Sequence, residues 1–324
     1  MKRSRIYENK NWTEITDDYV KKIGNIINES RQPVLFLGKG CNNYSKLIKE
    51  FVRKTNIPVT TSMHGMGVFP ENHALSLKMC GMHGSYAANM ALQNSDCIIN
   101  LGARFDDRTI GSKNYGKNAK NIIHCNIDEN EINKNVKANL PVVSDTGDFT
   151  QSLGEYVNYN YRQEWMRKIK GWKVMEPFKY NKGAQLMIPD VLKSIDRYKR
   201  NDDIFTFGVG NHLMMGCQYL TWMEPKTIIA SGSLGVMGVG IGYAIGTQIA
   251  NRDKKVICID GDGSFNMTLT DLQTIKRYNL PIKIVIMNDG ELGMVKVWEK
   301  LFFNERYTAT DNPNNPSYTD LAES

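Results

Sequence analysis

The sequence lacks a long uninterrupted run of apolar residues. Its nearest candidate, residues 234–249, is broken by five glycines, whereas a helix that spans a bilayer needs roughly 18 or more consecutive apolar residues. The start, Met1-Lys2-Arg3-Ser4-Arg5 followed by Glu8, has no apolar segment of the kind that secretory signals carry. We therefore expect no membrane partner and a cytoplasmic location. Import into an organelle stays open, because its signal would lie upstream.

Paired cysteine spacings and clusters of basic residues are also missing. Of the six cysteines, four lie in or beside apolar runs, as Cys97 and Cys258 do, which favours buried, reduced thiols over disulfides or a zinc site. The 41 Lys and Arg residues outnumber the 34 Asp and Glu residues but are scattered along the chain. This pattern argues against a nucleic-acid partner, although the net charge of +7 would favour an anionic ligand.

Length and patterning are those of a folded two-domain protein. The chain has 324 residues, of which 41% are hydrophobic and 23% charged, close to the average for globular proteins. Short apolar runs alternate with stretches of helical periodicity, which predicts an α/β fold with two doubly wound parallel-sheet domains. The expected strands are residues 34–37, 59–62, 97–101, 122–127, 204–209, 228–230, 256–259 and 282–287.

The expected division of the chain has three parts. Residues 14–155 form a central Rossmann-like domain, residues 156–183 form a helix and an extended linker, and residues 184–324 form the second domain. Pro177 and Gly183 support the linker, since both residue types interrupt regular structure. The apolar periodicity of residues 318–324 continues to the last residue, so we expect the second domain to be incomplete at its C-terminal end.

The segment that carries the chemistry is an apolar strand, residues 256–259, that runs into Gly261-Asp262-Gly263-Ser264. Glycines let the backbone approach a phosphate, and a helix N-terminus offers amide donors to an anion. Asp289 follows the next expected strand 27 residues later, and neighbouring parallel strands end at the same sheet edge. The two aspartates can therefore share Mg²⁺ with a diphosphate. Taken alone, Gly261 to Ser264 would read as a surface turn.

These residues resemble the thiamine diphosphate enzymes, and within them the acetolactate synthase (acetohydroxyacid synthase) catalytic subunits. The resemblance extends from about Pro33 to the last residue. It is carried by Gly261-Asp262-Gly263-Ser264-Phe265-Asn266-Met267-Thr268, Leu292-Gly293-Met294-Val295 with Trp298, Leu301-Phe302-Phe303-Asn304-Glu305-Arg306-Tyr307, Gly81-Met82-His83-Gly84 and Gly102-Ala103-Arg104-Phe105-Asp106-Asp107-Arg108.

The resemblance implies a set of roles in the second domain. Asp262, Asp289 and the main-chain oxygen of Glu291 would bind Mg²⁺, and Gly263 and Ser264 would hold the diphosphate. Met237 would wedge the cofactor into its bent form, while Met294 and Trp298 would close over the substrate, with Trp298 favouring the second 2-oxo acid. Without the resemblance, Met237, Met294 and Trp298 would read as core residues. The remaining cofactor-lining residues would be Asn211, His212, Gly235 and Val236.

In the first domain the resemblance implies an FAD site without redox function. Met82, His83, Arg104 and Asp106 would contact FAD, and Asp107 and Arg108 would lie near the substrate channel. Without the resemblance, His83 would be a core or capped histidine, and the acidic and basic pair would be a surface ion pair. The sequence departs from the family pattern at Asn126, where the family has Asp, as well as at Asn211, usually Gln, and Asp289, usually Asn.

The glutamate that activates the cofactor in this family belongs to an N-terminal domain that the 324 residues do not contain. We therefore expect a partial chain, inactive alone, of an enzyme that joins pyruvate to a second 2-oxo acid, pyruvate or 2-oxobutanoate, in branched-chain amino acid biosynthesis. Its expected partners are a second copy or a higher oligomer and a small regulatory subunit. The alternatives are a non-catalytic cofactor-binding remnant and a related thiamine diphosphate carboligase or decarboxylase.

Overall fold

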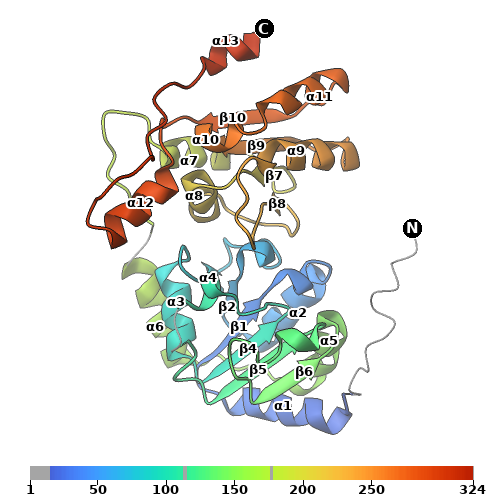
Figure 1. The fold of residues 1–324 in the computed structure, drawn as a ribbon. Coiled ribbons are helices and arrows are strands. Elements are labelled where there is room, and N and C mark those ends of the chain that lie inside the picture. The colour runs from blue at the N-terminus through green and yellow to red at the C-terminus, as the bar shows by residue number, and fades with distance from the viewer. Residues whose placement is uncertain (1–14, 112–114, 176–177, 324) are drawn as a thin grey trace. The chain divides into compact units, whose positions relative to one another are not determined.

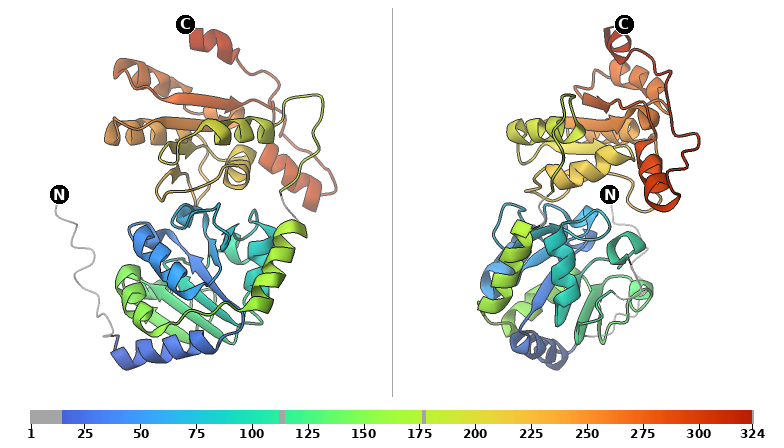
Figure 2. Two further views of the ribbon diagram at one scale, coloured as in Figure 1. Left: turned by 180° about the vertical axis from the view of Figure 1, so that it is seen from behind. Right: turned by 90° about the vertical axis from the view of Figure 1, so that its left-hand side faces the viewer.

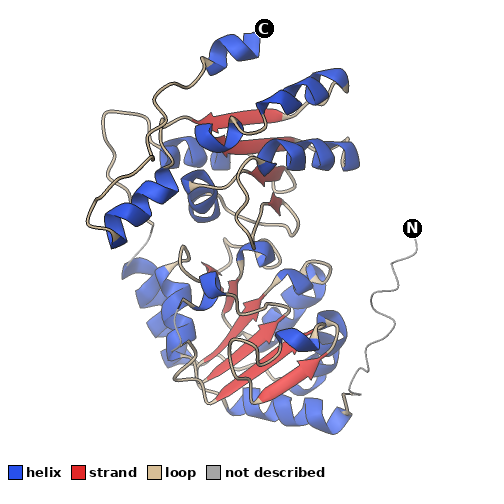
Figure 3. Cartoon of the chain, in the orientation of Figure 1, coloured by secondary structure: helices blue, strands red, loops and turns tan. Residues whose placement is uncertain are grey.

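The computed structural model describes residues 15–111, 115–175 and 178–323. The expected domain ends at residues 14 and 324, the N-terminal residues considered for a signal peptide, and Pro177 of the expected linker lie outside these ranges. Within them the chain divides into two compact units, one up to residue 177 and one from residue 178 onward. Each unit contains its own parallel sheet between helices (Figures 1 and 3). The predicted fold class of two parallel-sheet α/β domains is confirmed.

The first unit is built on a six-stranded sheet in the order β3-β2-β1-β4-β5-β6, in which every pairing is parallel. Its strands are β1 (Pro33–Leu37), β2 (Val59–Thr61), β3 (Ser76–Met79), β4 (Cys97–Leu101), β5 (Asn121–Asn126) and β6 (Leu140–Val143). Its helices are α1 (Asp17–Glu29), η2 (Lys39–Cys41), α2 (Ser45–Thr55), η3 (Met63–Gly65), α3 (Tyr86–Asn94), α4 (Asp107–Ile110), η4 (Glu129–Glu131), α5 (Thr146–Tyr156) and α6 (Gln163–Met175).

Helices cover both faces of this sheet (Figure 2). Alternate residues of a strand point to opposite faces, so Leu35 packs with the apolar faces of α1, α2 and α5, while Phe36 packs with α3 and α6. Helix α6 lies within the predicted helix-and-linker segment. Its Trp165 is buried in the core of the first unit and donates a hydrogen bond to the carbonyl of Pro33 at 3.1 Å.

The second unit is built on a four-stranded parallel sheet in the order β10-β9-β7-β8. Its strands are β7 (Ile204–Phe207), β8 (Ile228–Ile229), β9 (Val256–Gly261) and β10 (Lys283–Met287). Its helices are α7 (Ile188–Tyr198), α8 (Asn211–Tyr219), α9 (Val239–Ala250), α10 (Asp262–Phe265), η5 (Leu269–Asp271), α11 (Leu272–Arg277), α12 (Gly293–Phe302) and α13 (Tyr318–Glu323).

Two different apolar layers hold this second sheet in place. On one face Ala244 of α9 packs against Ile204 and Cys258. On the other, Phe207 contacts the ring of Trp222 at 6.3 Å and lies under Gly216 of α8, where a β-carbon would come within 2.6 Å of the Phe207 ring. These layers fix the carboxyl ends of β7 and β9, and those ends carry the candidate site.

Candidate functional site

Three neighbouring strands of the second unit end at one edge of their sheet. β7, β9 and β10 are parallel and adjacent, and Met287 at the end of β10 pairs with Gly261 at the end of β9. The segments that follow them therefore lie side by side, which is the usual position of ligand sites in open α/β sheets. These segments carry Asn211 and His212, Asp262 to Ser264, and Asp289 to Glu291.

The three segments line an open pocket with about 440 Å³ of empty space, part of it open to solvent. Most of the residues predicted for cofactor, metal or substrate in this unit are in its wall, namely Asn211, His212, Met237, Asp262, Gly263, Ser264, Asp289, Glu291 and Met294. The wall also contains residues for which the sequence predicted no role: Ile188, Val209, Met287, Leu292, Gly293 and Val295.

Three predicted residues do not line this pocket in the part of the chain that the structure describes: Gly235, Val236 and Trp298. Gly235 has a φ of +63° and Val236 is exposed, so both belong to the open loop before α9. Trp298 is 41% exposed and its ring packs on Phe302 of the same helix at 5.0 Å. Their proposed roles are therefore not supported by position in this pocket.

The loop before α9 is tied to the site by Ser264. The Ser264 hydroxyl accepts a hydrogen bond from the backbone of Gly238 at 2.9 Å, and Thr268 donates to the carbonyl of Gly238 at 2.7 Å. Gly238 has a φ of +80°, which favours glycine at this turn. The loop brings Met237 to the pocket, where its methyl group lies 3.7 Å from the position that a β-carbon would take on Gly263.

Two carboxylates face the polar end of the pocket. Asp262 is 1% exposed. Burial raises the pKa of Asp289, and the neighbouring Asp262 raises it further, against a hydrogen bond from the backbone of Glu291 at 3.2 Å that lowers it. Two negative groups this close repel each other, and a divalent cation between them would remove that repulsion. The pair is thus suited to hold a cation.

His212 forms a second buried pair, with Asp260. His212 Nε2 lies 3.5 Å from Asp260 Oδ1, and both side chains are buried. Burial lowers the pKa of His212 to about 4, although a hydrogen bond to Gly208 and the charge of Asp262 raise it. Burial also raises the pKa of Asp260 to about 6, against hydrogen bonds from Ser264 and Gly261. His212 is therefore neutral near pH 7, and its ring can serve the pocket only as a neutral donor or acceptor.

In the first unit, the topological switch point lies between β1 and β4, because the chain continues to β2 and β3 on one side and to β5 and β6 on the other. Ligands of doubly wound sheets bind at this position. The turn after β1 crosses the turn after β4 so closely that a β-carbon on Gly38 would lie 2.2 Å from the carbonyl oxygen of Gly102. The sequence analysis did not single out Gly38-Lys39-Gly40 as part of a ligand site, although a pair of glycines directly after a buried strand could have marked it.

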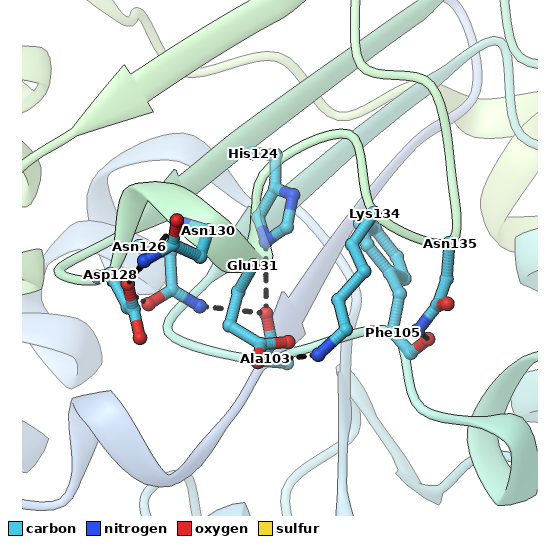
Figure 4. A network of polar contacts seen from close by, with 9 residues as sticks. All are labelled: Ala103, Phe105, His124, Asn126, Asp128, Asn130, Glu131, Lys134 and Asn135. Carbon is cyan, nitrogen blue, oxygen red and sulfur yellow. Dashed lines mark hydrogen bonds and ion pairs between the residues drawn. The ribbon is translucent and has the colours of Figure 1, made fainter.

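A polar network fixes the turn after β4 (Figure 4). The carbonyl of Ala103 accepts hydrogen bonds from His124 Nε2 at 3.0 Å and from the side-chain amides of Asn126 and Asn100 at 3.3 and 3.1 Å. Asn135 donates to the carbonyl of Phe105 at 2.9 Å. A carboxylate at position 126 could not donate in this way, so Asn126 stabilises the turn as an aspartate would not.

The predicted FAD residues lie in two loops that contact each other. Met82 donates its backbone N–H to the carbonyl of Arg108 at 2.8 Å. Asp106 caps helix α4, where its carboxylate accepts from the backbone and the hydroxyl of Thr109 at 3.0 and 2.8 Å. Burial and the charge of Arg108 lower the pKa of His83. The structure thus joins the two motifs, and it gives Asp106 a capping role.

The other predicted residues of this unit are more open. Asp107 and Arg108 form an ion pair at 3.7 Å with both side chains largely exposed, which contributes little to stability. Arg104 lies near His64, whose pKa is lowered by burial and then by the charges of Lys39 and Arg104. These cationic groups at the switch point give it a positive field that suits a phosphate-bearing ligand.

The residues that the structure describes contain neither a ready-made cluster of metal-binding side chains nor a helix that could cross a membrane. No group of three or more His, Cys, Asp or Glu side chains there is arranged to hold a metal. A cation at Asp262 and Asp289 would therefore need main-chain or ligand oxygens as well. No helix in residues 15–111, 115–175 and 178–323 combines the length and apolar character that crossing a membrane requires.

Both units match models of one enzyme family. Residues 20–153 match the thiamine pyrophosphate enzyme central domain, and residues 208–324 match its C-terminal TPP binding domain. The chain belongs to the thiamine pyrophosphate enzyme family. The second unit is accordingly a thiamine diphosphate-binding domain, and the pocket at the ends of β7, β9 and β10 lies within it.

Within this family the chain is similar to acetolactate synthases. It is 39% identical over 326 aligned residues to the mitochondrial acetolactate synthase catalytic subunit of Saccharomyces cerevisiae, an alignment that covers 94% of this chain and 47% of the yeast protein. It is 37% identical to the acetolactate synthase large subunit of Lactococcus lactis, with 95% and 54% covered. The tobacco chloroplastic acetolactate synthase 1 is 36% identical, with 91% and 46% covered. The chain spans about half the length of the curated relatives it matches.

Proposed function

We propose that this chain supplies the cofactor-binding part of an acetolactate synthase catalytic subunit, which decarboxylates pyruvate and joins the product to pyruvate or 2-oxobutanoate. The observation that carries the proposal is the pocket at the ends of β7, β9 and β10. Similarity to acetolactate synthases over nearly the whole chain supports the choice of reaction within the family.

The wall of the pocket fits a cofactor with an apolar ring system at one end and a charged diphosphate at the other. Met237, Leu292 and Met294 offer apolar surface. Asn211, at the start of α8, offers an amide and the free backbone N–H groups of a helix N-terminus to phosphate oxygens. Bound thiamine diphosphate supplies the nucleophilic carbon that attacks the 2-oxo acid. The role of this chain is to bind and orient it.

Magnesium fits the polar end of the same pocket. Asp262 and Asp289 provide hard oxygen donors, and Mg²⁺ is bound by one or two carboxylates together with phosphate oxygens rather than by a protein-only cage. Glu291 is in the wall, and its main-chain oxygen would complete the protein's share of the ligands. Burial and then the charge of Asp262 raise the pKa of Asp289, and in this assignment the metal would offset the repulsion from Asp262.

FAD is proposed for the first unit. Its support is the switch point between β1 and β4, the close crossing of Gly38 and Gly102, and the cations Lys39 and Arg104 beside them. Asn126 in place of the family's Asp does not oppose this assignment, because its side-chain amide donates a hydrogen bond to the carbonyl of Ala103 and so helps to hold the turn after β4.

We also propose the assembly of the family, a homodimer or higher oligomer with a small regulatory subunit. Its support is that the relatives carry the names catalytic subunit and large subunit. Two other functions from the sequence analysis, a binding-only remnant and a related carboligase or decarboxylase, have no observation in their favour and serve as outcomes of the test.

The first test is binding of Mg²⁺ and thiamine diphosphate to the 324-residue chain by calorimetry. We expect magnesium-dependent binding with one site per chain, and absence of binding would contradict the proposal. The second test is the product formed from pyruvate and 2-oxobutanoate by the protein at its native length. Acetolactate and acetohydroxybutyrate support the proposal, another product indicates the related carboligase, and binding without turnover indicates the remnant.

The specificity role of Trp298 is tested in the same assay. If Trp298 favours 2-oxobutanoate as the second substrate, Trp298→Leu will lower the ratio of acetohydroxybutyrate to acetolactate while leaving cofactor binding unchanged. Trp222→Leu is not a suitable control, since Trp222 is 1% exposed and packs in the core. Phe302→Leu is not suitable either, because the Phe302 ring packs against Trp298; Val297→Ala, on the same helix and as exposed as Trp298, is suitable. An unchanged ratio in Trp298→Leu would remove the role.

A further inference from the structure

The segment that follows α12 returns to the pocket and pairs with its wall. Leu292 donates its backbone N–H to the carbonyl of Thr310 at 2.7 Å, and Asn312 donates to the carbonyl of Gly290 at 2.7 Å. Glu291 and Asp311 form an antiparallel bridge between these bonds. The segment is therefore held against the loop that carries Asp289 and Glu291, and it brings a pair of asparagines to the carboxylate of Asp262.

Asn315 uses the full hydrogen-bonding capacity of its side chain at this position. Its amide nitrogen donates to Asp262 Oδ2 at 2.7 Å and to Asn288 Oδ1 at 3.0 Å. Its amide oxygen accepts from Asn266 at 2.9 Å and from Asn312 at 2.9 Å. An amide offers two donors and two acceptor positions, so reversing the Asn315 amide would break all of these bonds. The orientation of this side chain is fixed.

Asn266, which donates to Asn315, is itself held in place by Tyr318. The hydroxyl of Tyr318 donates to Asn266 Oδ1 at 2.9 Å, and the Tyr318 ring packs edge-on against Phe265 at 5.6 Å. Phe265 is buried and ends helix α10, which begins at Asp262. The segment from Asn315 to Tyr318 thus contacts both ends of helix α10, at Asp262 and at Phe265.

Asn315 joins two chain segments that both supply proposed metal ligands. Asp262 follows β9, and Asn288 directly precedes Asp289 after β10. Asn312 also donates to Asp262 Oδ2, at 3.2 Å. Because the side-chain amides of Asn312 and Asn315 both donate to Oδ2 of Asp262, Oδ1 of Asp262 is the oxygen that remains to face a cation. Hydrogen bonds to a carboxylate are stronger than those between neutral groups, so this contact restricts the rotation of the Asp262 side chain.

We propose that Asn315 is a positioning residue for the metal centre, which holds Asp262 and the Asn288-Asp289 segment at the separation that a magnesium diphosphate needs. This inference rests on the proposed function. Hydrogen-bond partners of metal ligands orient those ligands, and their loss typically weakens metal affinity about 10- to 100-fold. The position is readable in the sequence only as one more asparagine in Asn312-Pro313-Asn314-Asn315, where nothing marks it from its neighbours.

The test compares Asn315→Ala with Asn314→Ala in the 324-residue chain. Asn314 is the adjacent residue of the same type and is exposed. Mg²⁺ affinity is measured by calorimetry at saturating thiamine diphosphate, and Mn²⁺ is used as a second probe, because its electron paramagnetic resonance spectrum reports the geometry of the bound metal. For Asn315→Ala we expect the Mg²⁺ affinity to fall by roughly tenfold or more and the Mn²⁺ spectrum to change. Asn314→Ala should behave as the wild type does.

A purely structural role would lower the melting temperature of the ligand-free chain without changing the Mn²⁺ spectrum, and that result overturns the inference. Wild-type Mg²⁺ affinity in Asn315→Ala overturns it too. If Asn315→Ala does not fold, Asn312→Ala decides, since it removes one amide from Asp262 Oδ2 and keeps Asn315: a smaller loss of Mg²⁺ affinity supports the inference and an unchanged affinity contradicts it. Failure of the wild-type chain to bind Mg²⁺ and thiamine diphosphate would overturn the proposed function, and the inference with it.

Discussion

Asp262 is the single residue on which the proposed metal site depends most. It is buried at the start of α10, and its carboxylate is the oxygen donor next to the pocket's glycine turn. We expect Asp262→Ala to abolish magnesium-dependent binding of thiamine diphosphate, with an affinity loss of at least about 100-fold, because even outer hydrogen-bond partners of a metal ligand cost 10- to 100-fold. Calorimetry checks this. The control is Asp253→Ala, because Asp253 is exposed and precedes the N-terminal end of β9, away from Asp262; this variant should bind Mg²⁺ and thiamine diphosphate as the wild type does. Magnesium-dependent binding of thiamine diphosphate by Asp262→Ala would remove the metal assignment.

Asp289 gives this chain two carboxylates where the family pattern has one and an asparagine. Removing one of two negative charges weakens attraction for a cation, so we expect Asp289→Asn to bind Mg²⁺ alone several-fold more weakly than the wild type. The backbone contact from Glu291 should persist, since an amide oxygen also accepts a hydrogen bond. Titration with Mg²⁺ in the absence of thiamine diphosphate measures the effect. Tighter Mg²⁺ binding by Asp289→Asn would show that repulsion of Asp289 by Asp262 dominates.

We expect His124 to make the stability of the first unit sensitive to acid. It is fully buried, it donates from Nε2 to the carbonyl of Ala103, and its Nδ1 has no hydrogen-bond partner among the residues that the structure describes. Burial lowers its pKa below the ordinary 6.5. The unfolded chain therefore binds a proton near pH 6.5 that the folded chain does not, so this contribution to stability is complete above pH 6.5 and falls below it, by up to about 1.4 kcal/mol per pH unit.

This prediction is checked by urea unfolding of the wild type and His124→Gln between pH 7.5 and about 5. Glutamine can donate to the Ala103 carbonyl but does not titrate, so its stability should decline less steeply with acid than that of the wild type. Other histidines titrate in both proteins and cancel in the comparison. Equal slopes would mean that His124 is not the responsible group.

Helix α9 contains two glycines, Gly240 and Gly242, of which only Gly240 is crowded by neighbouring atoms. Substituting each by alanine therefore separates the cost of crowding from the gain in helix propensity. A β-carbon on Gly240 would lie 2.6 Å from Asp260 Oδ2 and 2.8 Å from the backbone nitrogen of Gly208, whereas one on Gly242 would meet nothing within 4 Å. We expect Gly240→Ala to destabilise the second unit by about 1–3 kcal/mol through overpacking. Gly242→Ala should stabilise it by about 0.5–1 kcal/mol, since alanine is favoured over glycine inside a helix. Urea unfolding measures both, and the opposite order would contradict the packing described at Asp260.

In the first sheet the sequence predicted the four inner strands, and the reason is burial, whereas in the second sheet it predicted all four strands, including the edge strands β8 and β10. Every residue of β1 and β4 is buried, so both appear as continuous apolar runs. The strands that were missed, β3 and β6, are sheet edges. Pro141 is exposed within β6, and Lys78 in β3 has a φ of +64° beside an irregular pairing with β2. Edge strands tolerate proline, charge and irregularity, and such residues remove the apolar pattern.

The candidate site was predictable only where residues follow strands in the sequence. Asp262 and Asp289 could be brought together because parallel strands end at one edge. Asn315 could not, since its position depends on a loop that returns after α12 and pairs with residues 290–292. Trp298 was assigned by resemblance, and its exposed position on α12 could not be foreseen, because helical spacing does not tell which face meets a partner.

At the scale of the whole chain, each unit has its own sheet, its own buried core and its own proposed ligand. Such units can unfold separately, and a ligand stabilises the unit that binds it. We expect two transitions in calorimetric melting of the chain. Thiamine diphosphate with Mg²⁺ at about 100 times its Kd should stabilise one unit by about 2.7 kcal/mol and leave the other unchanged, and FAD should do the reverse.

Gly240→Ala assigns the transitions, because its β-carbon would crowd Asp260 in the second unit. The transition that Gly240→Ala lowers should be the one that thiamine diphosphate raises, and the other should be the one that acid lowers through His124. If both ligands moved a single common transition, the units would unfold as one cooperative body despite their separate cores. If FAD raised the transition that Gly240→Ala lowers, the flavin assignment to the switch point between β1 and β4 would be wrong, while the thiamine diphosphate assignment would still be judged by its own shift.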